Sequence, residues 1–151
     1  MASKRKAQRS LYVTEAMHKK VRTEAAKRDC ELHDVAEAAL DAILAKVKPG
    51  TTAGELVDAS GIIEAGGFTI IDDLVHGYGG GYLPPVLGSA SRPAAVPRPD
   101  LTLAENMCLV VQPNVTTTDG LAGVQTGHLI QVTADGYRDL QRFPRGYCVI
   151  G

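Results

Sequence analysis

The strongest constraint on the fold is a run of apolar residues at helical spacing that ends abruptly at Pro49-Gly50. The apolar positions of this run are Leu32, Val35, Ala36, Ala39, Leu40, Ile43, Leu44 and Val47. Residues three and four apart share one face of an α-helix, so the pattern predicts an amphipathic helix over residues 31–46. The proline and glycine that follow it are typical helix stops.

A capping box predicts a second helix directly after this stop. Thr52 stands at the N-cap position, and Glu55 follows at the spacing from which a carboxylate reaches back to the backbone of the cap. The pattern predicts a helix over residues 53–65, which ends at Gly66-Gly67.

Segments rich in β-forming residues follow, separated by glycine, proline and turn residues. Strands are predicted over residues 68–75, 107–112, near 123–133 and near 137–143, with a glycine-dense segment over 76–85 and a proline-rich loop over 88–100. Helices come first and antiparallel strands come after them, which is the order expected of an α+β domain.

The charges divide the chain into two parts. Residues 1–30 hold nine Lys and Arg against three acidic residues, whereas the rest holds seven basic and fourteen acidic residues. This split favours an anionic partner such as nucleic acid for the basic arm, or a solubilising role for it. No window approaches the roughly 18 apolar residues of a membrane span, and no apolar core follows the basic start. We therefore expect a cytoplasmic protein that does not bind membranes.

Four blocks in the second part of the chain follow one another in a recognisable order. They are residues 48–56, the His-Gly-Tyr-Gly of residues 76–79, residues 105–114, and residues 123–136. In this order they resemble the creatinase/aminopeptidase P family of metallopeptidases, the pita-bread enzymes. The resemblance covers residues 31–151 and only the C-terminal half of the family's catalytic domain. It implies a partial pita-bread-like domain of helices packed on an antiparallel sheet, preceded by a basic strand-helix or helical arm over residues 1–30.

The same resemblance implies a dinuclear metal centre that activates water for attack on a peptide carbonyl. The family uses two Asp from its first half, one His and two Glu as ligands. His76 matches the histidine, Gln112 and Gly127 stand where the family has glutamates, and no aspartate pair matches upstream of Leu32. The expected protein is a non-catalytic or incomplete peptidase-like module without a cofactor. If the family site were retained, Mn, Co or Zn would bind at His76, and the chain would be an Xaa-Pro peptidase.

A pocket that has lost its metal is also expected from the resemblance. Its predicted lining residues are His76, Tyr78, Tyr82, Gln112 and Gln125. A purely structural interpretation stays open for each of them: the glutamines could satisfy backbone groups beside strands, and His76 could be an interior histidine with a hydrogen-bond partner.

Residues 4–46 are similar in layout to a ribbon-helix-helix DNA-binding domain, which gives an alternative function. In that family a two-stranded ribbon enters the major groove, so alternate residues of the strand face the bases. The predicted DNA-contacting residues are Gln8, Ser10 and Tyr12 toward the bases, with Arg5, Lys6 and Arg9 available for phosphates. The chain would then be a transcriptional regulator fused to a peptidase-like domain. Asp29 at the inter-helix turn and Glu31 at the next helix start depart from that family's pattern.

Half of a pita-bread domain leaves an apolar face that its other half would cover. A face of this kind favours self-association, so we expect a homodimer under either functional hypothesis.

Overall fold

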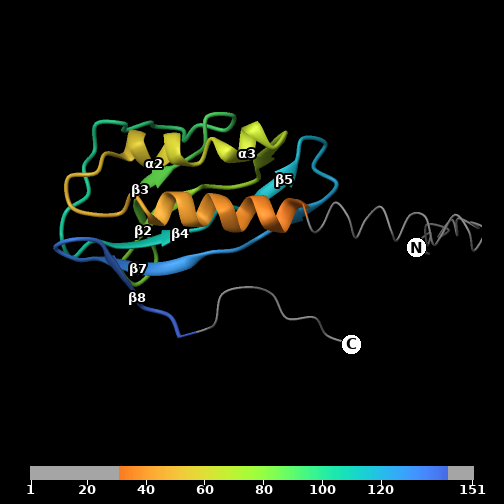
Figure 1. Cartoon of the computed structure of the whole chain (residues 1–151). Helices are drawn as coiled ribbons and strands as arrows, with labels where there is room; N and C mark the ends of the chain where they lie inside the picture. Colours follow the sequence, from red (N-terminus) through yellow and green to blue (C-terminus); the bar gives the residue numbers. More distant parts are fainter. Residues whose placement is uncertain (1–30, 143–151) are drawn as a thin grey trace, which may run out of the picture.

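The computed structural model of the chain describes residues 31–142 (Figure 1). Residues 31–44 are helical, which confirms the first predicted helix. The side chains buried along it are Leu32, Ala36, Ala39, Leu40, Ile43 and Leu44. The DNA-contacting residues predicted between Arg5 and Tyr12 lie outside the described residues.

The predicted capping box is formed. The Thr52 hydroxyl accepts a hydrogen bond from the backbone N–H of Glu55 at 3.2 Å. In return, the Glu55 carboxylate accepts one from the backbone N–H of Thr52 at 2.7 Å. The helix that this box starts is α2, Ala53–Ala59.

The prediction of a single helix over residues 53–65 is wrong, because a second, short helix, α3 (Ile62–Ala65), follows a break. The break lies at Ser60. Its backbone N–H and its hydroxyl both donate to the carbonyl of Val57, at 3.0 and 2.7 Å. A serine side chain that competes for helix carbonyls in this way is unfavourable inside a helix, so the helical ladder ends there.

Eight strands form two antiparallel sheets in the described part of the chain. They are β1 (Phe68–Ile70), β2 (Val75–Tyr78), β3 (Tyr82–Leu87), β4 (Cys108–Val111), β5 (Val115–Thr117), β6 (Gly123–Val124), β7 (His128–Val132) and β8 (Tyr137–Asp139). One sheet has the strand order β1-β5-β6, and the other has the order β3-β2-β4-β7-β8. The predicted α+β class is confirmed, and so is the strand within 107–112.

The single strand predicted over residues 68–75 is wrong, because the chain passes from one sheet to the other within it. β1 pairs with β5, whereas β2 pairs with β3 and β4. Between them, Ile71 donates its backbone N–H to Asn114 and Leu74 donates to Leu87, at 3.0 and 2.7 Å. The run predicted near 123–133 is divided in the same way, between β6 and β7.

The glycine-dense segment over residues 76–85, for which the sequence predicted no element, forms most of the β2–β3 hairpin. Glycine is required at position 77, where a Cβ atom would overlap the backbone carbonyl of Pro84. The glycines therefore allow close backbone packing inside a hairpin. The short strand β5 was not predicted, whereas residues 88–100 form the loop expected there.

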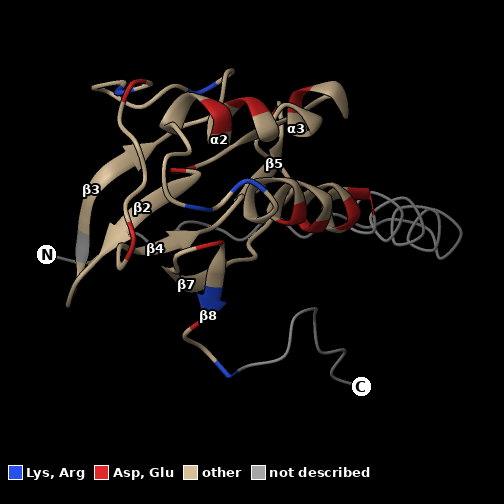
Figure 2. Ribbon diagram, turned by 60° about the vertical axis from the view of Figure 1, so that its left-hand side comes forward, with Lys and Arg blue, Asp and Glu red and all other residues tan. Residues whose placement is uncertain are grey.

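The helices pack on one face of the five-stranded sheet (Figure 1). On that face Val75, Leu109 and Ile130 are buried in the core. The opposite face carries His76, Val110 and Leu129, which lie in register on β2, β4 and β7, and we call it the open face. Figure 2 shows acidic residues on the helices, whereas β2, β3 and β4 contain no charged residue. No helix within residues 31–142 is long and apolar enough to cross a membrane.

Candidate ligand cavity at the junction of the two sheets

A shallow cavity of about 470 Å³ lies where β4 ends and β7 begins. Its lining residues are Tyr78, Val110, Gln112, Gln125, Thr126, Gly127, His128, Leu129 and Gln141. Three of the five predicted pocket residues, Tyr78, Gln112 and Gln125, thus lie around one cavity. Gln112 follows β4 and Gln125 precedes β7, which form one antiparallel pair whose ends meet at this junction, and Tyr78 comes from the neighbouring strand β2.

The other two predicted pocket residues lie on the neighbouring hairpin. His76 is in register with Val110 on the open face and is 7% exposed, but it is not part of the cavity lining. Its Nδ1 lies 2.9 Å from the carbonyl oxygen of Gly77. This contact agrees with the interpretation of His76 as an interior histidine with a hydrogen-bond partner. Tyr82 pairs with Tyr78 in backbone register.

Gln112 is tied to a buried carboxylate. Its Nε2 donates to Asp73 Oδ1 at 3.0 Å, and its backbone N–H donates to the carbonyl of Leu74 at 2.9 Å. Asp73 is only 5% exposed. An amide can donate to this carboxylate, whereas a carboxylate at position 112 would face a like charge. The surroundings of position 112 therefore suit glutamine and oppose glutamate.

Gly127 lies against the end of β4 without room for a side chain. A Cβ atom at position 127 would lie 2.9 Å from the carbonyl oxygen of Val111 and 3.0 Å from the Cβ of Gln112. The first contact is to backbone, which cannot turn aside as a flexible side chain can. The close approach of the two strands explains why glycine stands here.

Hydrogen bonds between β7 and the segment that includes β8 stabilise one side of the cavity, and the sequence analysis did not identify the residues that form them. His128 Nδ1 lies 2.9 Å from Asp139 Oδ1, across β7 and β8. The amide of Gln141 donates to the carbonyl of Gly127 at 3.0 Å and accepts from the N–H of Leu129 at 3.3 Å. The sequence did contain a signal for these pairs. The turn at residues 134–136 joins β7 to β8 and sets which residues of the two strands lie opposite each other.

The donor set at this place does not fit a dinuclear metal centre. Two divalent ions close together require bridging carboxylates, which the resemblance would have placed at positions 112 and 127. Gln112 offers a neutral amide that is engaged with Asp73, and Gly127 offers no side chain. Within residues 31–142, no group of three or more His, Cys, Asp and Glu side chains is arranged to hold a metal ion.

The sequence pattern of metallopeptidase family M24 matches residues 11–134. The chain belongs to this family. The M24 match takes in residues 11–46, and the ribbon-helix-helix resemblance of that segment finds no support in any comparison. No curated protein sequence matches the chain.

Solved structures show the same fold. Methionine aminopeptidase from Rickettsia prowazekii is 26% identical with a TM-score of 0.59, and the match covers 74% of this chain and 52% of the aminopeptidase. Prolidase from Pyrococcus furiosus is 24% identical with a TM-score of 0.63, over 78% of this chain and 34% of the prolidase. X-Pro aminopeptidase from Thermotoga maritima is 23% identical with a TM-score of 0.64, over 79% and 32%. The chain thus spans between a third and a half of the length of these M24 proteins, which confirms the partial pita-bread-like fold.

Proposed function

We propose that this chain is a peptidase-like M24 module whose metal ligands are mostly lost and which does not catalyse peptide hydrolysis. The observation that carries the proposal is the packing at Gly127, where the backbone of β4 occupies the space that a ligand side chain needs. A glutamate at this position would require the two strands to separate.

The pairing of Gln112 with Asp73 supports the same proposal independently. A metal ligand must present an unshared electron pair to the ion, and an amide does this more weakly than a carboxylate. The Gln112 oxygen that could face an ion is neutral, and the amide nitrogen donates to Asp73, which ties the side chain to the internal structure. What remains is a cavity of amides and hydroxyls that can hydrogen-bond a ligand, with Tyr78 and Gln125 exposed at its rim.

The test is hydrolysis of Xaa-Pro dipeptides and of a peptide with N-terminal methionine by the full chain, with Mn²⁺, Co²⁺ or Zn²⁺ added. The matched control is His76→Ala, which removes the one side chain that corresponds to a family ligand. We expect the two proteins to show the same background rate with every metal. Metal-dependent turnover that disappears in His76→Ala would contradict the proposal.

The open face supports a second proposal, that the chain forms a homodimer. Tyr78 on β2 and Leu140 after β8 are 43% and 41% exposed. Exposed apolar groups on one face of a sheet favour association through it. Light scattering of the full chain should give the mass of two copies, and a Leu140→Lys variant should shift it to one. A monomeric wild-type protein at micromolar concentration would refute the dimer.

A further inference from the structure

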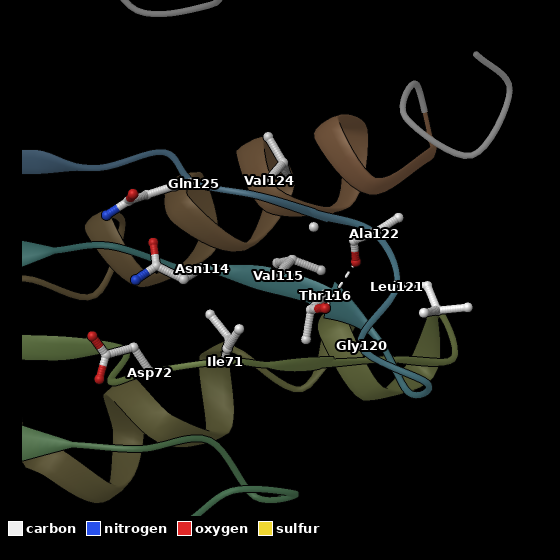
Figure 3. Close-up of a pocket in the computed structure, with 11 residues that line it drawn as sticks. Ile71, Asp72, Asn114, Val115, Thr116, Gly120, Leu121, Ala122, Val124 and Gln125 are labelled. Carbon is white, nitrogen blue, oxygen red and sulfur yellow. Dashed lines mark hydrogen bonds between the residues drawn. The ribbon is translucent and has the colours of Figure 1, made fainter. Parts of the chain in front are cut away.

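A second cavity, of about 390 Å³, lies along β5 and β6 at the sheet junction (Figure 3). Among its polar lining residues are three from separate segments: Asp72 before β2, Asn114 between β4 and β5, and Gln125 after β6. Figure 3 shows the carboxylate of Asp72 and the amides of Asn114 and Gln125 at the same end of this cavity. Gln125 lines both cavities, whereas Asp72 and Asn114 line only this one.

Two buried oxygen atoms at this junction have no hydrogen-bond partner among the described residues. They are Oδ1 of Asn114, a residue that is 4% exposed, and Oδ2 of Asp73, which is 5% exposed and adjacent to Asp72. A buried polar atom without a partner costs about 1–3 kcal/mol, and native structures contain few of them. Both atoms are acceptors, so the missing partner is a donor or a cation.

The charge at this place points to a cation. Neither Asp72 nor Asp73 forms an ion pair with a Lys or Arg of the described residues. One of these carboxylates is exposed and the other is buried, where a charge without a counterion is costly. The available ligands are carboxylate and amide oxygens, without thiolate or imidazole. Oxygen-only sites select hard cations such as Mg²⁺ and Ca²⁺ over zinc or copper.

We propose that Asp72, Asn114 and Gln125 bind one hard divalent cation of the Mg²⁺ or Ca²⁺ class. Asp72 supplies the charged oxygen, and the two amides supply neutral oxygens, one from the connection between β4 and β5 and one from the segment after β6. Asp73 adds negative charge from behind, held in place by Gln112. The cavity leaves room for the water ligands that complete the coordination shell of such an ion. The ion would link the two sheets at the place where the chain passes from one sheet to the other.

The test is calorimetric titration of the full chain with Ca²⁺ and with Mg²⁺. Three variants are compared with the wild type: Asp72→Asn at the site, Asp58→Asn as an exposed acid-to-amide control on α2, and His76→Ala at the family position. We expect one ion per chain with a dissociation constant of about 10⁻⁴–10⁻³ M, the range of sites with few ligands. Asp72→Asn should weaken binding at least about tenfold, while both other variants bind as the wild type does.

A second measurement keeps the test informative if one variant folds poorly. Saturating Ca²⁺ should raise the unfolding temperature of the wild type and of Asp58→Asn, and should leave that of Asp72→Asn unchanged. Absence of binding, or equal binding by Asp72→Asn, would overturn the cation site. Loss of binding in His76→Ala alone would instead place the ion at the family position and would count against the proposed function. The two failures are therefore distinguishable.

Discussion

Replacement of Gln112 by glutamate tests the local chemistry most sharply. In the family to which this chain belongs, the resemblance places a glutamate at this position. Gln112→Glu therefore restores the residue that the family has at this position. Family membership alone would predict no loss of unfolding free energy. The contact with Asp73 predicts the opposite, because the variant exchanges a hydrogen-bond donor 3.0 Å from a buried carboxylate for a second carboxylate.

The magnitude follows from two effects. Loss of a hydrogen bond to a charged acceptor costs about 1.5–3 kcal/mol. Two like charges at this separation repel by about 5 kcal/mol at an effective dielectric constant of 20. The new carboxylate can turn toward the cavity that Gln112 lines, which relieves most of the repulsion. We expect the variant to lose about 2–3 kcal/mol of unfolding free energy at pH 7.

The assay is urea unfolding at pH 7 and at pH 5, with Gln131→Glu as the matched control. Gln131 lies on β7, and its amide donates to Asn106 at an exposed position, so the same chemical change there should cost less than about 1 kcal/mol. The deficit of Gln112→Glu should shrink at pH 5, because protonation of one of the two carboxyl groups removes the repulsion. Equal stability of variant and wild type at pH 7 would refute the reasoning.

Three further predictions concern stability. Gly127→Ala should cost about 1–3 kcal/mol in urea unfolding, because its Cβ meets the backbone of β4, whereas Gly81→Ala, which meets nothing within 4 Å, should cost much less. Thr52→Ala removes the cap of α2 and should cost about 1 kcal/mol in the same unfolding assay, and an unchanged unfolding free energy would contradict the capping role. Burial raises the pKa of Glu64, but hydrogen bonds from the loop at Ser91 outweigh it and hold the pKa below its ordinary value. The stability that this carboxylate adds is complete above its ordinary pKa and is lost as the pH falls through the lowered value. Unfolding of Glu64→Gln, followed by circular dichroism, should therefore be less sensitive to acid, and an unchanged pH profile would count against this.

Local patterns in the sequence determined the parts of the fold that local interactions hold. The apolar spacing from Leu32 onward and the Thr52 capping box act within a few residues, and both appear as predicted. The break at Ser60 was missed because a serine inside a helical pattern is compatible with either outcome until its hydroxyl finds a carbonyl. Residues 68–75 were predicted as one strand because a composition rich in β-forming residues does not show in which of two sheets each residue pairs.

The cavity was predictable only in part. Tyr78, Gln112 and Gln125 were identified from the motifs that carry the family resemblance. The partner of Gln112 was not, because Asp73 is 39 residues away and adjoins no motif. The crowding at Gly127 was also beyond the sequence, since a glycine can mark a turn, a bulge or a close approach, and only the packing of β4 against β7 decides which.

The most direct test of the central claim is the cobalt content of the wild-type chain and of His76→Ala after equilibrium dialysis against Co²⁺. If the family's dinuclear centre is lost, removal of the imidazole changes nothing, and both proteins retain the same amount of cobalt. Two cobalt ions per wild-type chain, lost in His76→Ala, would show that a metallopeptidase centre exists in spite of Gln112 and Gly127, and would contradict the account.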